Sequence, residues 1–182
     1  MNRYIAEFEK VSFEQFKKDV ESLQIAYKYN WENALRCNYD IKDIYDNIKL
    51  PVRATCGSAG YDFFSPFPLI NLECEHSVVI PTGIKCKIDN DWTLILFPKS
   101  GLGNNYRLKL DGTVGIIDAD YYNCENNEGH ILVKLTNHDS CHRSVMIPQG
   151  KSYCQGIFFQ YGLTKGDNVT DKRVGGFGST GR

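Results

Sequence analysis

The spacing of apolar residues changes near residue 50 of this 182-residue chain. Before that point one apolar stripe recurs at helical spacing and comprises Phe13, Phe16, Val20 and Leu23. Ser12 precedes the stripe and Gln15 follows three residues later, which is the signature of a capping box at a helix start. A second stripe follows Asp40 and comprises Ile41, Ile44, Tyr45 and Ile48. The pattern from Met1 to about Ile48 is therefore helical, and we predict a helical N-terminal extension over residues 1–50.

After residue 50 the apolar runs become short and are separated by Gly, Pro, Asn or Asp. Five of these runs are rich in β-branched and aromatic residues: SVVIP, IKCKI, WTLILF, GHILVKLTN and CQGIFFQY. Many short strands with regular turn signals are typical of an all-β sandwich or a jelly roll. We therefore predict an all-β, jelly-roll-like core over residues 51–165 and a flexible C-terminal arm over residues 166–182.

Composition narrows the range of functions. A net charge of −1 and a pI near 6.4 argue against a protein that mainly coats nucleic acid, because such proteins carry a basic excess. No apolar run is long enough to cross a bilayer, and the first residues, MNRYIAEFEK, lack the apolar core of a signal peptide. The seven cysteines include no CxxC pair, so we expect reduced thiols. We expect a cytoplasmic protein that binds neither nucleic acid nor membranes.

Polar residues with chemical potential gather in two stretches within the β region. In GIIDADYYN a short apolar run leads to Asp118 and Asp120, and a carboxylate against an apolar wall can act as a general base. In PKSGLG, Lys99, Ser100 and the amide of Gly101 together resemble a small anion site. Ordinary turns, capped by aspartate in the first case, are the competing interpretation of each stretch taken alone.

Two further stretches combine glycine with polar side chains. In GSAGYDFFS, Asp62 follows small residues that let a backbone approach closely, although an exposed turn would look the same. The glycine-rich GGFGSTG lacks the P-loop pattern GxxxxGK[ST]. It still offers backbone amides, the hydroxyls of Ser179 and Thr180, and the ring of Phe177, which can stack on a base.

Taken in order, GSAGYD, PKSGL, GIIDADY, the CQ of SYCQGIFF and GGFGSTG resemble the five motifs of the trimeric dUTPase (deoxyuridine triphosphate nucleotidohydrolase) family. The resemblance implies a β jelly roll that forms a homotrimer with active sites shared between subunits. It implies hydrolysis of dUTP to dUMP and pyrophosphate with Mg²⁺ as cofactor. The glycine-rich tail is then an arm that closes over the nucleotide.

The resemblance also implies roles for individual residues. Asp118 matches the carboxylate that activates the water attacking the α-phosphorus, and Asp62 matches a residue that holds Mg²⁺ through water. Tyr121 matches a ring that packs under the deoxyribose and leaves no room for a 2′-hydroxyl. The residues that match contacts to phosphate or base are Lys99, Ser100, Gly101, Gln155, Phe177, Gly178, Ser179 and Thr180, with Lys172 or Arg173 as the cation of the arm.

Three features depart from the family pattern. Lys99 stands where the family usually has arginine, and it lacks the planar fork that binds a phosphate with two hydrogen bonds. Gly112 occupies a place where the family often has asparagine. After Tyr121 the segment YNCENNEG inserts several residues beside the hairpin whose backbone would read uracil. The sequence leaves the effect of all three features open.

Two other functions compete with dUTP hydrolysis. A dCTP deaminase has the same fold, but its catalytic glutamate falls where this chain has Lys134, so the general base is missing. A catalytically weak nucleotide-binding protein that regulates a protein partner, through the N-terminal extension or the insertion, is the alternative from another class. A zinc site is not predicted, because the spacing of its candidate ligands matches no standard pattern: His138, Cys141, His142 and Cys124.

Overall fold

The computed structural model describes residues 4–26, 39–171, 173 and 176. The strands are β1 (Ala6–Lys10), β2 (Val52–Arg53), β3 (Tyr61–Phe64), β4 (Leu69–Leu72), β5 (Ser77–Pro81), β6 (Ile84–Ile88), β7 (Trp92–Pro98), β8 (Leu108–Leu110), β9 (Gly115–Ile117), β10 (Leu132–Asn137), β11 (Val145–Pro148) and β12 (Ser152–Gln160). The helices are α1 (Phe13–Ala26), α3 (Ile41–Asp46), α4 (Ser100–Tyr106) and the 3-10 turn η1 (Ala119–Tyr121). None of the described helices is long and apolar enough to span a membrane.

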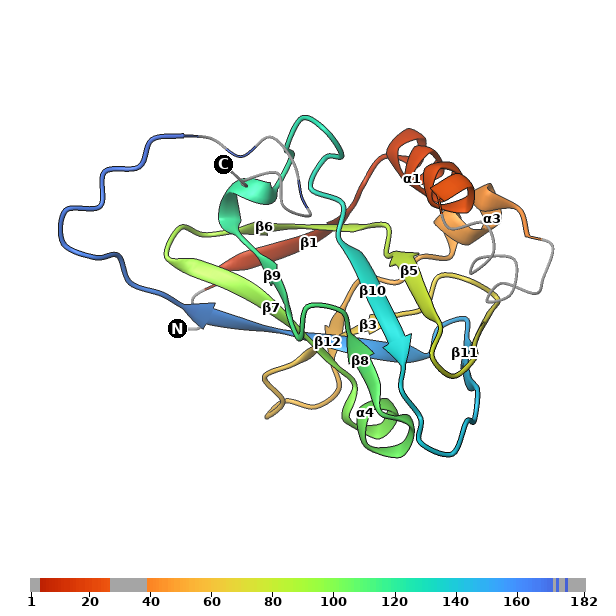
Figure 1. The fold of residues 1–182 in the computed structure, drawn as a ribbon. Coiled ribbons are helices and arrows are strands. Elements are labelled where there is room, and N and C mark those ends of the chain that lie inside the picture. Colours follow the sequence, from red (N-terminus) through yellow and green to blue (C-terminus); the bar gives the residue numbers. More distant parts are fainter. Residues whose placement is uncertain (1–3, 27–38, 172, 174–175, 177–182) are drawn as a thin grey trace.

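Antiparallel sheets form most of the regular secondary structure, which confirms the predicted all-β fold. The largest sheet has the strand order β2-β3-β12-β7-β9, and a second has the order β5-β10-β8 (Figure 1). Two smaller ladders pair β1 with β6 and β11 with β4. All five runs that the sequence pattern singled out form strands, and β5 and β6 have the predicted bounds. Neighbours far apart in sequence, such as β3 and β12, are typical of jelly-roll connections.

Helix α1 begins where the sequence predicts, although its cap differs from a capping box. The backbone N–H of Gln15 donates to Ser12 Oγ at 3.1 Å, as expected. The Gln15 side chain does not return this bond but donates to Asp19 at 2.8 Å. The N–H of Ser12 instead donates to a carboxylate distant in sequence, Glu128, at 2.9 Å. The helix start is therefore held by tertiary contacts as well as by its own residues.

The apolar stripe of α1 faces the core, as predicted. Phe16 and Val20 are completely buried, and Leu23 is nearly so. The second predicted helix, α3, begins after Asp40, whose carboxylate accepts a hydrogen bond from the Lys42 N–H at 2.8 Å. Both helices therefore follow from local sequence signals, and both add apolar side chains to the core that the sheets share.

The helical prediction for the first residues is wrong, because Ala6–Lys10 form strand β1. The strand pairs with β6, with Phe8 opposite Cys86. The ring of Phe8 packs against those of Tyr61, Phe63 and Phe158, at centroid distances of 5.4, 5.7 and 5.8 Å. The glutamates and lysine of AEFEK favour helix, but pairing with β6 and burial of one aromatic ring override that local preference.

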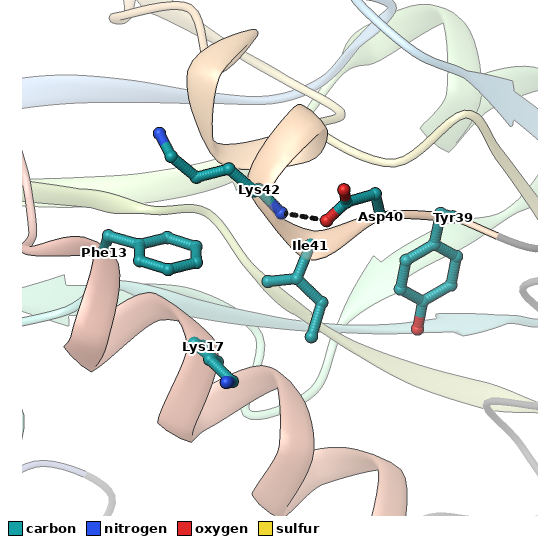
Figure 2. Close-up of a pocket in the computed structure, with 6 residues that line it drawn as sticks. All are labelled: Phe13, Lys17, Tyr39, Asp40, Ile41 and Lys42. Carbon is teal, nitrogen blue, oxygen red and sulfur yellow. Dashed lines mark hydrogen bonds between the residues drawn. The ribbon is translucent and has the colours of Figure 1, made fainter.

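A surface groove of about 630 Å³ lies where α1 and α3 meet. Figure 2 shows its lining, which consists of Phe13, Lys17, Tyr39, Asp40, Ile41 and Lys42. The carboxylate of Asp40 is engaged in capping α3, and Lys42 pairs with Asp46 one turn away. None of the residues predicted to carry chemistry lines this groove.

We expect Phe16→Ala to lower the free energy of unfolding by about 3–5 kcal/mol, because it removes a completely buried ring and leaves a cavity. Urea denaturation at one fixed protein concentration measures the change. Lys18→Ala on the exposed side of the same helix is the control and should change stability little. Equal losses for the two variants would show that α1 is not packed into the core.

Candidate active site

Two carboxylates, Asp118 and Asp120, lie just after the end of strand β9, as the motif GIIDADY predicts. Ile117 is the last residue of β9 and pairs with Leu94 of β7. Asp118 follows with extended backbone, and its carbonyl accepts a hydrogen bond from the Tyr121 N–H at 3.1 Å. The turn η1 therefore starts at Asp118 and places Asp120 and Tyr121 beside it.

Arg173 contacts both carboxylates. Its Nη2 donates to Asp118 Oδ2, and its Nε donates to Asp120 Oδ1 at 3.0 Å. The guanidinium carbon lies 5.9 Å from the centre of the Tyr121 ring, within the range of a cation–π contact. Arg173, one of the two cations predicted for the arm, reaches this site, and the other, Lys172, lies outside the described residues.

A cavity of about 290 Å³ opens beside Tyr121. Its lining comprises Leu96, Leu110, Asp111, Val114, Gly115, Ile116, Ile117, Tyr121, Leu132, Lys134, Arg173 and Gly176. Burial raises the pKa of the Tyr121 phenol, so the hydroxyl is neutral at physiological pH. Gly176 lies against this hydroxyl, since a Cβ added there would be only 2.8 Å from the oxygen. The cavity is thus bounded by the buried ring of Tyr121, by the backbone between β8 and β9, and by Arg173 and Gly176 of the C-terminal segment.

The hairpin between β8 and β9 forms one wall of the cavity. Its tip has positive φ at Gly112 (79°) and Thr113 (76°). This region suits glycine or asparagine, so Gly112 keeps the backbone shape that an asparagine would allow. It is unfavourable for the β-branched Thr113, and the hairpin therefore depends on contacts from outside to keep its shape.

Asp111 supplies such a contact. Its carboxylate accepts hydrogen bonds from Lys134 Nζ at 2.8 Å and from Thr136 Oγ1, both on β10. Burial raises the pKa of the Asp111 carboxyl, but the bonds from Lys134 and Thr136 outweigh it and hold the pKa below its ordinary value. Sequence reasoning missed Asp111, because no motif distinguishes it from an ordinary turn aspartate.

A second group of predicted residues gathers around the other end of β7. Lys99 follows β7, and its Nζ lies 2.5 Å from Asp62 Oδ1 on β3. Asp62 lies opposite Gln155 of β12 in the strand register. Ser100 and Gly101 begin helix α4 directly after Lys99. The sequence motifs that contain these residues therefore meet at one place, as the resemblance implies.

The two groups lie far apart within one chain. The Oγ1 of Thr93 donates to the carbonyl of Ile117 at 3.0 Å, so Asp118 is next to the start of β7. Lys99 follows the last residue of that strand, about 20 Å away at a rise of ~3.3 Å per residue. A single chain therefore does not bring Asp118 together with the Lys99–Asp62 pair.

The remaining predicted residues of the arm, Phe177, Gly178, Ser179 and Thr180, lie outside the described residues. Within the described part of the chain, no cluster of three His, Cys, Asp or Glu side chains could hold a metal ion.

Comparison with known proteins identifies the family. The family model for dUTPase matches residues 46–181. The deoxyuridine 5'-triphosphate nucleotidohydrolase of Lactococcus lactis is 34% identical over 147 residues, which cover 79% of this chain and 96% of that protein. The chain belongs to the dUTPase family. This confirms the resemblance drawn from the five motifs.

Other dUTPases support the assignment. The enzyme from Glaesserella parasuis is 31% identical over 148 residues, covering 78% of this chain and 93% of its own. The crystal structure of dUTPase from Streptococcus mutans matches with a TM-score of 0.58 at 35% identity, covering 66% of this chain and 91% of that chain. A mutant dUTPase from phage phi11 of S. aureus, whose structure describes a structural Mg(II) ion, shares the fold with a TM-score of 0.55 at 20% identity, covering 69% and 92%.

We expect Asp111→Asn to destabilise the protein at pH 7, because the bonds from Lys134 and Thr136 favour the ionised carboxylate. A carboxyl whose pKa is lower in the folded state stabilises the protein at pH values above its unfolded-state pKa of ~3.9. This stabilisation is lost as the pH falls through the folded-state pKa. Denaturation midpoints of wild type and variant should therefore differ at pH 7 and converge once the pH falls below the folded-state pKa. Asp91→Asn, at an exposed position, is the control. A gap that stays constant with pH would contradict the interpretation.

Proposed function

We propose that this dUTPase-family protein is a dUTP diphosphatase that hydrolyses dUTP to dUMP and pyrophosphate. The observation that carries the proposal is the position of Asp118 at the end of an apolar strand, next to the cavity that contains Tyr121. The dUTPases named above share most of their length with this chain.

Asp118 is the proposed general base. Its carboxylate accepts a proton from water, and the water oxygen attacks the α-phosphorus while the bond to the bridging oxygen of pyrophosphate breaks. The carboxylate is partly exposed, so water can reach it. Arg173 pairs with Asp118 in this structure and must release it for catalysis. A guanidinium binds phosphate as well as carboxylate, so the arriving triphosphate can draw Arg173 away and free the base.

The cavity beside Tyr121 is the proposed site for the deoxyuridine. The hairpin backbone between β8 and β9 would read the uracil, and the Tyr121 ring would lie under the sugar. A pocket that is merely apolar rejects an added hydroxyl only about 10²-fold. A ring held in one position can exclude the 2′-hydroxyl sterically, and the discrimination against a ribonucleotide can then exceed this factor.

Asp62 fits a Mg²⁺ ion that is held mainly by the substrate. Magnesium commonly binds one or two carboxylates together with substrate phosphates and water. Asp62 is a largely buried carboxylate with Gln155 opposite and Lys99 in contact, so it can hold such an ion through water. The bound ion would neutralise charge on the triphosphate. Lys99, Ser100 and Gly101 would contact the phosphates.

A complete site requires more than one copy of the chain. Asp118 and the Lys99–Asp62 pair lie at opposite ends of β7, about 20 Å apart at ~3.3 Å per residue. We therefore propose a symmetric homotrimer in which Asp118 and Tyr121 of one subunit face Lys99, Asp62 and Gln155 of another. A closed ring of identical contacts completes each site in the same way.

We expect rapid release of pyrophosphate from dUTP and much slower release from dTTP, dCTP and UTP in the presence of Mg²⁺. Asp118→Asn should lower the dUTP rate by about 10²–10⁴, the contribution of a general base. Asp46→Asn, at an exposed carboxylate on α3, is the matched control and should keep the wild-type rate. Tight dUTP binding without turnover in the wild type would contradict the proposal and favour a nucleotide-binding regulator.

Mixing two inactive variants tests the shared site. Asp118→Asn and Lys99→Ala each remove one half, so each should be weakly active alone. After joint unfolding and refolding at equal amounts, about a quarter of the sites should combine two intact halves, and activity should recover accordingly. Refolding each variant separately is the control. A mixture no more active than its separate components would show that one chain supplies the whole site.

A further inference from the structure

The insertion after Tyr121 and the N-terminal segment contact each other at several points. Figure 1 shows the loop between η1 and β10 next to the connection from β1 to α1. We use the word clasp for the hydrogen bonds between residues 9–19 and residues 122–130. Neither segment belongs to the five motifs that resemble those of the dUTPase family.

Glu128 forms the centre of the clasp. Its carboxylate accepts hydrogen bonds from the N–H of Ser12 at 2.9 Å and from Ser12 Oγ at 2.5 Å. Lys85 Nζ lies 3.6 Å from the same carboxylate and donates to Asn123 Oδ1 at 2.7 Å. Burial raises the pKa of Glu128, but the bonds from Ser12 and the charge of Lys85 outweigh it and hold the pKa below its ordinary value. The insertion thus caps helix α1 with an ionised carboxylate.

Two more bonds flank this centre. The Tyr122 hydroxyl donates to the Glu9 carboxylate, at 2.8 and 2.9 Å from its two oxygens. On the other side His130, which is completely buried, lies 2.6 Å from Asp19 Oδ2 through Nδ1. The Gly83 N–H donates to Nε2 of the same ring at 2.7 Å, so the proton lies on Nδ1 and is donated to Asp19. The histidine is therefore fixed in both orientation and tautomer.

The clasp continues to Tyr121 through Asn127. The Oδ1 of Asn127 accepts hydrogen bonds from the Gly129 N–H at 3.2 Å and from the Cys124 thiol at 3.0 Å. These two donors set the orientation of the amide, so that Nδ2 donates to the Tyr121 hydroxyl at 2.8 Å. The hydroxyl in turn donates to the carbonyl of His130 at 2.9 Å. The Tyr121 hydroxyl thus has one donor and one acceptor, both from the clasped loop.

The backbone of the insertion also follows Tyr121 closely. Gly129 has a φ of 77°, and a Cβ there would lie 2.4 Å from the Tyr121 carbonyl oxygen. Any side chain at this position would push the loop away. The loop therefore packs directly against Tyr121.

We propose that Asn127 is a positioning residue for Tyr121 and that the N-terminal segment holds Asn127 in place through the clasp. The inference rests on the proposed function, in which the Tyr121 ring excludes the 2′-hydroxyl of a ribonucleotide. A ring that loses its hydrogen bond from Asn127 can tilt and admit that hydroxyl. The N-terminal extension thus contributes to sugar selectivity without touching the nucleotide.

A double-mutant cycle tests the role of Asn127. The ratio of kcat/KM for dUTP over UTP is measured for wild type, Asn127→Ala, Tyr121→Phe and the double variant. Asn127→Ala should lower the ratio about fivefold, the effect of one neutral hydrogen bond, mainly through a lower KM for UTP. In the Tyr121→Phe background it should have no further effect, because the accepting oxygen is gone. An unchanged ratio, or equal losses in both backgrounds, would overturn the proposal.

The Kd values for dUMP and UMP provide a readout that does not depend on turnover. If the wild type fails to hydrolyse dUTP but prefers dUMP, and Asn127→Ala weakens that preference, the proposed function fails while the role of Asn127 stands. A preference for dUMP that is unaltered in Asn127→Ala would refute the role of Asn127. Asn127→Ser, with a smaller loss of volume, replaces the alanine variant if thermal melting shows that the latter is unfolded.

Glu128→Gln and Ser12→Ala test the contribution of the N-terminal segment. Both should lower the dUMP-over-UMP preference in the same direction as Asn127→Ala, although by less. Glu21→Gln, at an exposed ion pair on the same helix, is the matched control. Variants of the clasp that lower the melting temperature but keep the full preference would show that the extension only stabilises the fold.

Discussion

The pairing of β7 with a neighbour on each side determines where the chemistry lies. β12 and β9 flank β7 with a continuous antiparallel register. This arrangement favours glycine at position 156, because a Cβ there would lie 2.7 Å from Leu94 Cδ1 and 3.2 Å from Phe63 Cε2, and the Leu94 side chain would have to shift. β9 then ends beside the first residues of β7, and Lys99 follows the last residue of β7. The distance between Asp118 and Lys99 is thus a consequence of strand length, and no side-chain movement can close it within one chain.

Charge balance explains why Arg173 lies at the turn that follows β9. Asp118 and Asp120 are two carboxylates at one turn, and Arg173 binds both while its side chain is mostly buried. A triphosphate would bring more negative charge, and two of its oxygens can accept a pair of guanidinium hydrogen bonds as a carboxylate does, so it would compete for the guanidinium. In the proposed mechanism the arriving substrate would thereby free Asp118. The same exchange would place the cation of the arm over the phosphates, so that one residue serves the site both before and after the substrate arrives.

The fold could be predicted from the sequence wherever local signals agree with tertiary packing. β5, β6 and the turn at Asp118 are bounded by glycine, proline or aspartate, and the apolar residues of β5 and β6 are buried as expected. β1 could not be predicted, since its helix-forming residues become a strand only through pairing with β6. The motifs predicted a set of residues for the site. They did not indicate that these residues form two groups, because strand register and length decide the distance between them.

The role of the insertion was also beyond sequence reasoning, and the reason is physical. Closing a longer loop costs little extra entropy, so insertions are easily tolerated on a surface. Beside Tyr121, however, the loop brings polar groups that are buried or partly buried and need partners. Ser12, Glu9 and Asp19 provide them, and each lies more than a hundred residues away in the chain. No local sequence pattern predicts that the polar groups of these two segments pair with each other. Because the insertion and the extension satisfy each other's polar groups, loss of either would remove hydrogen bonds from the other next to the ring that lines the cavity.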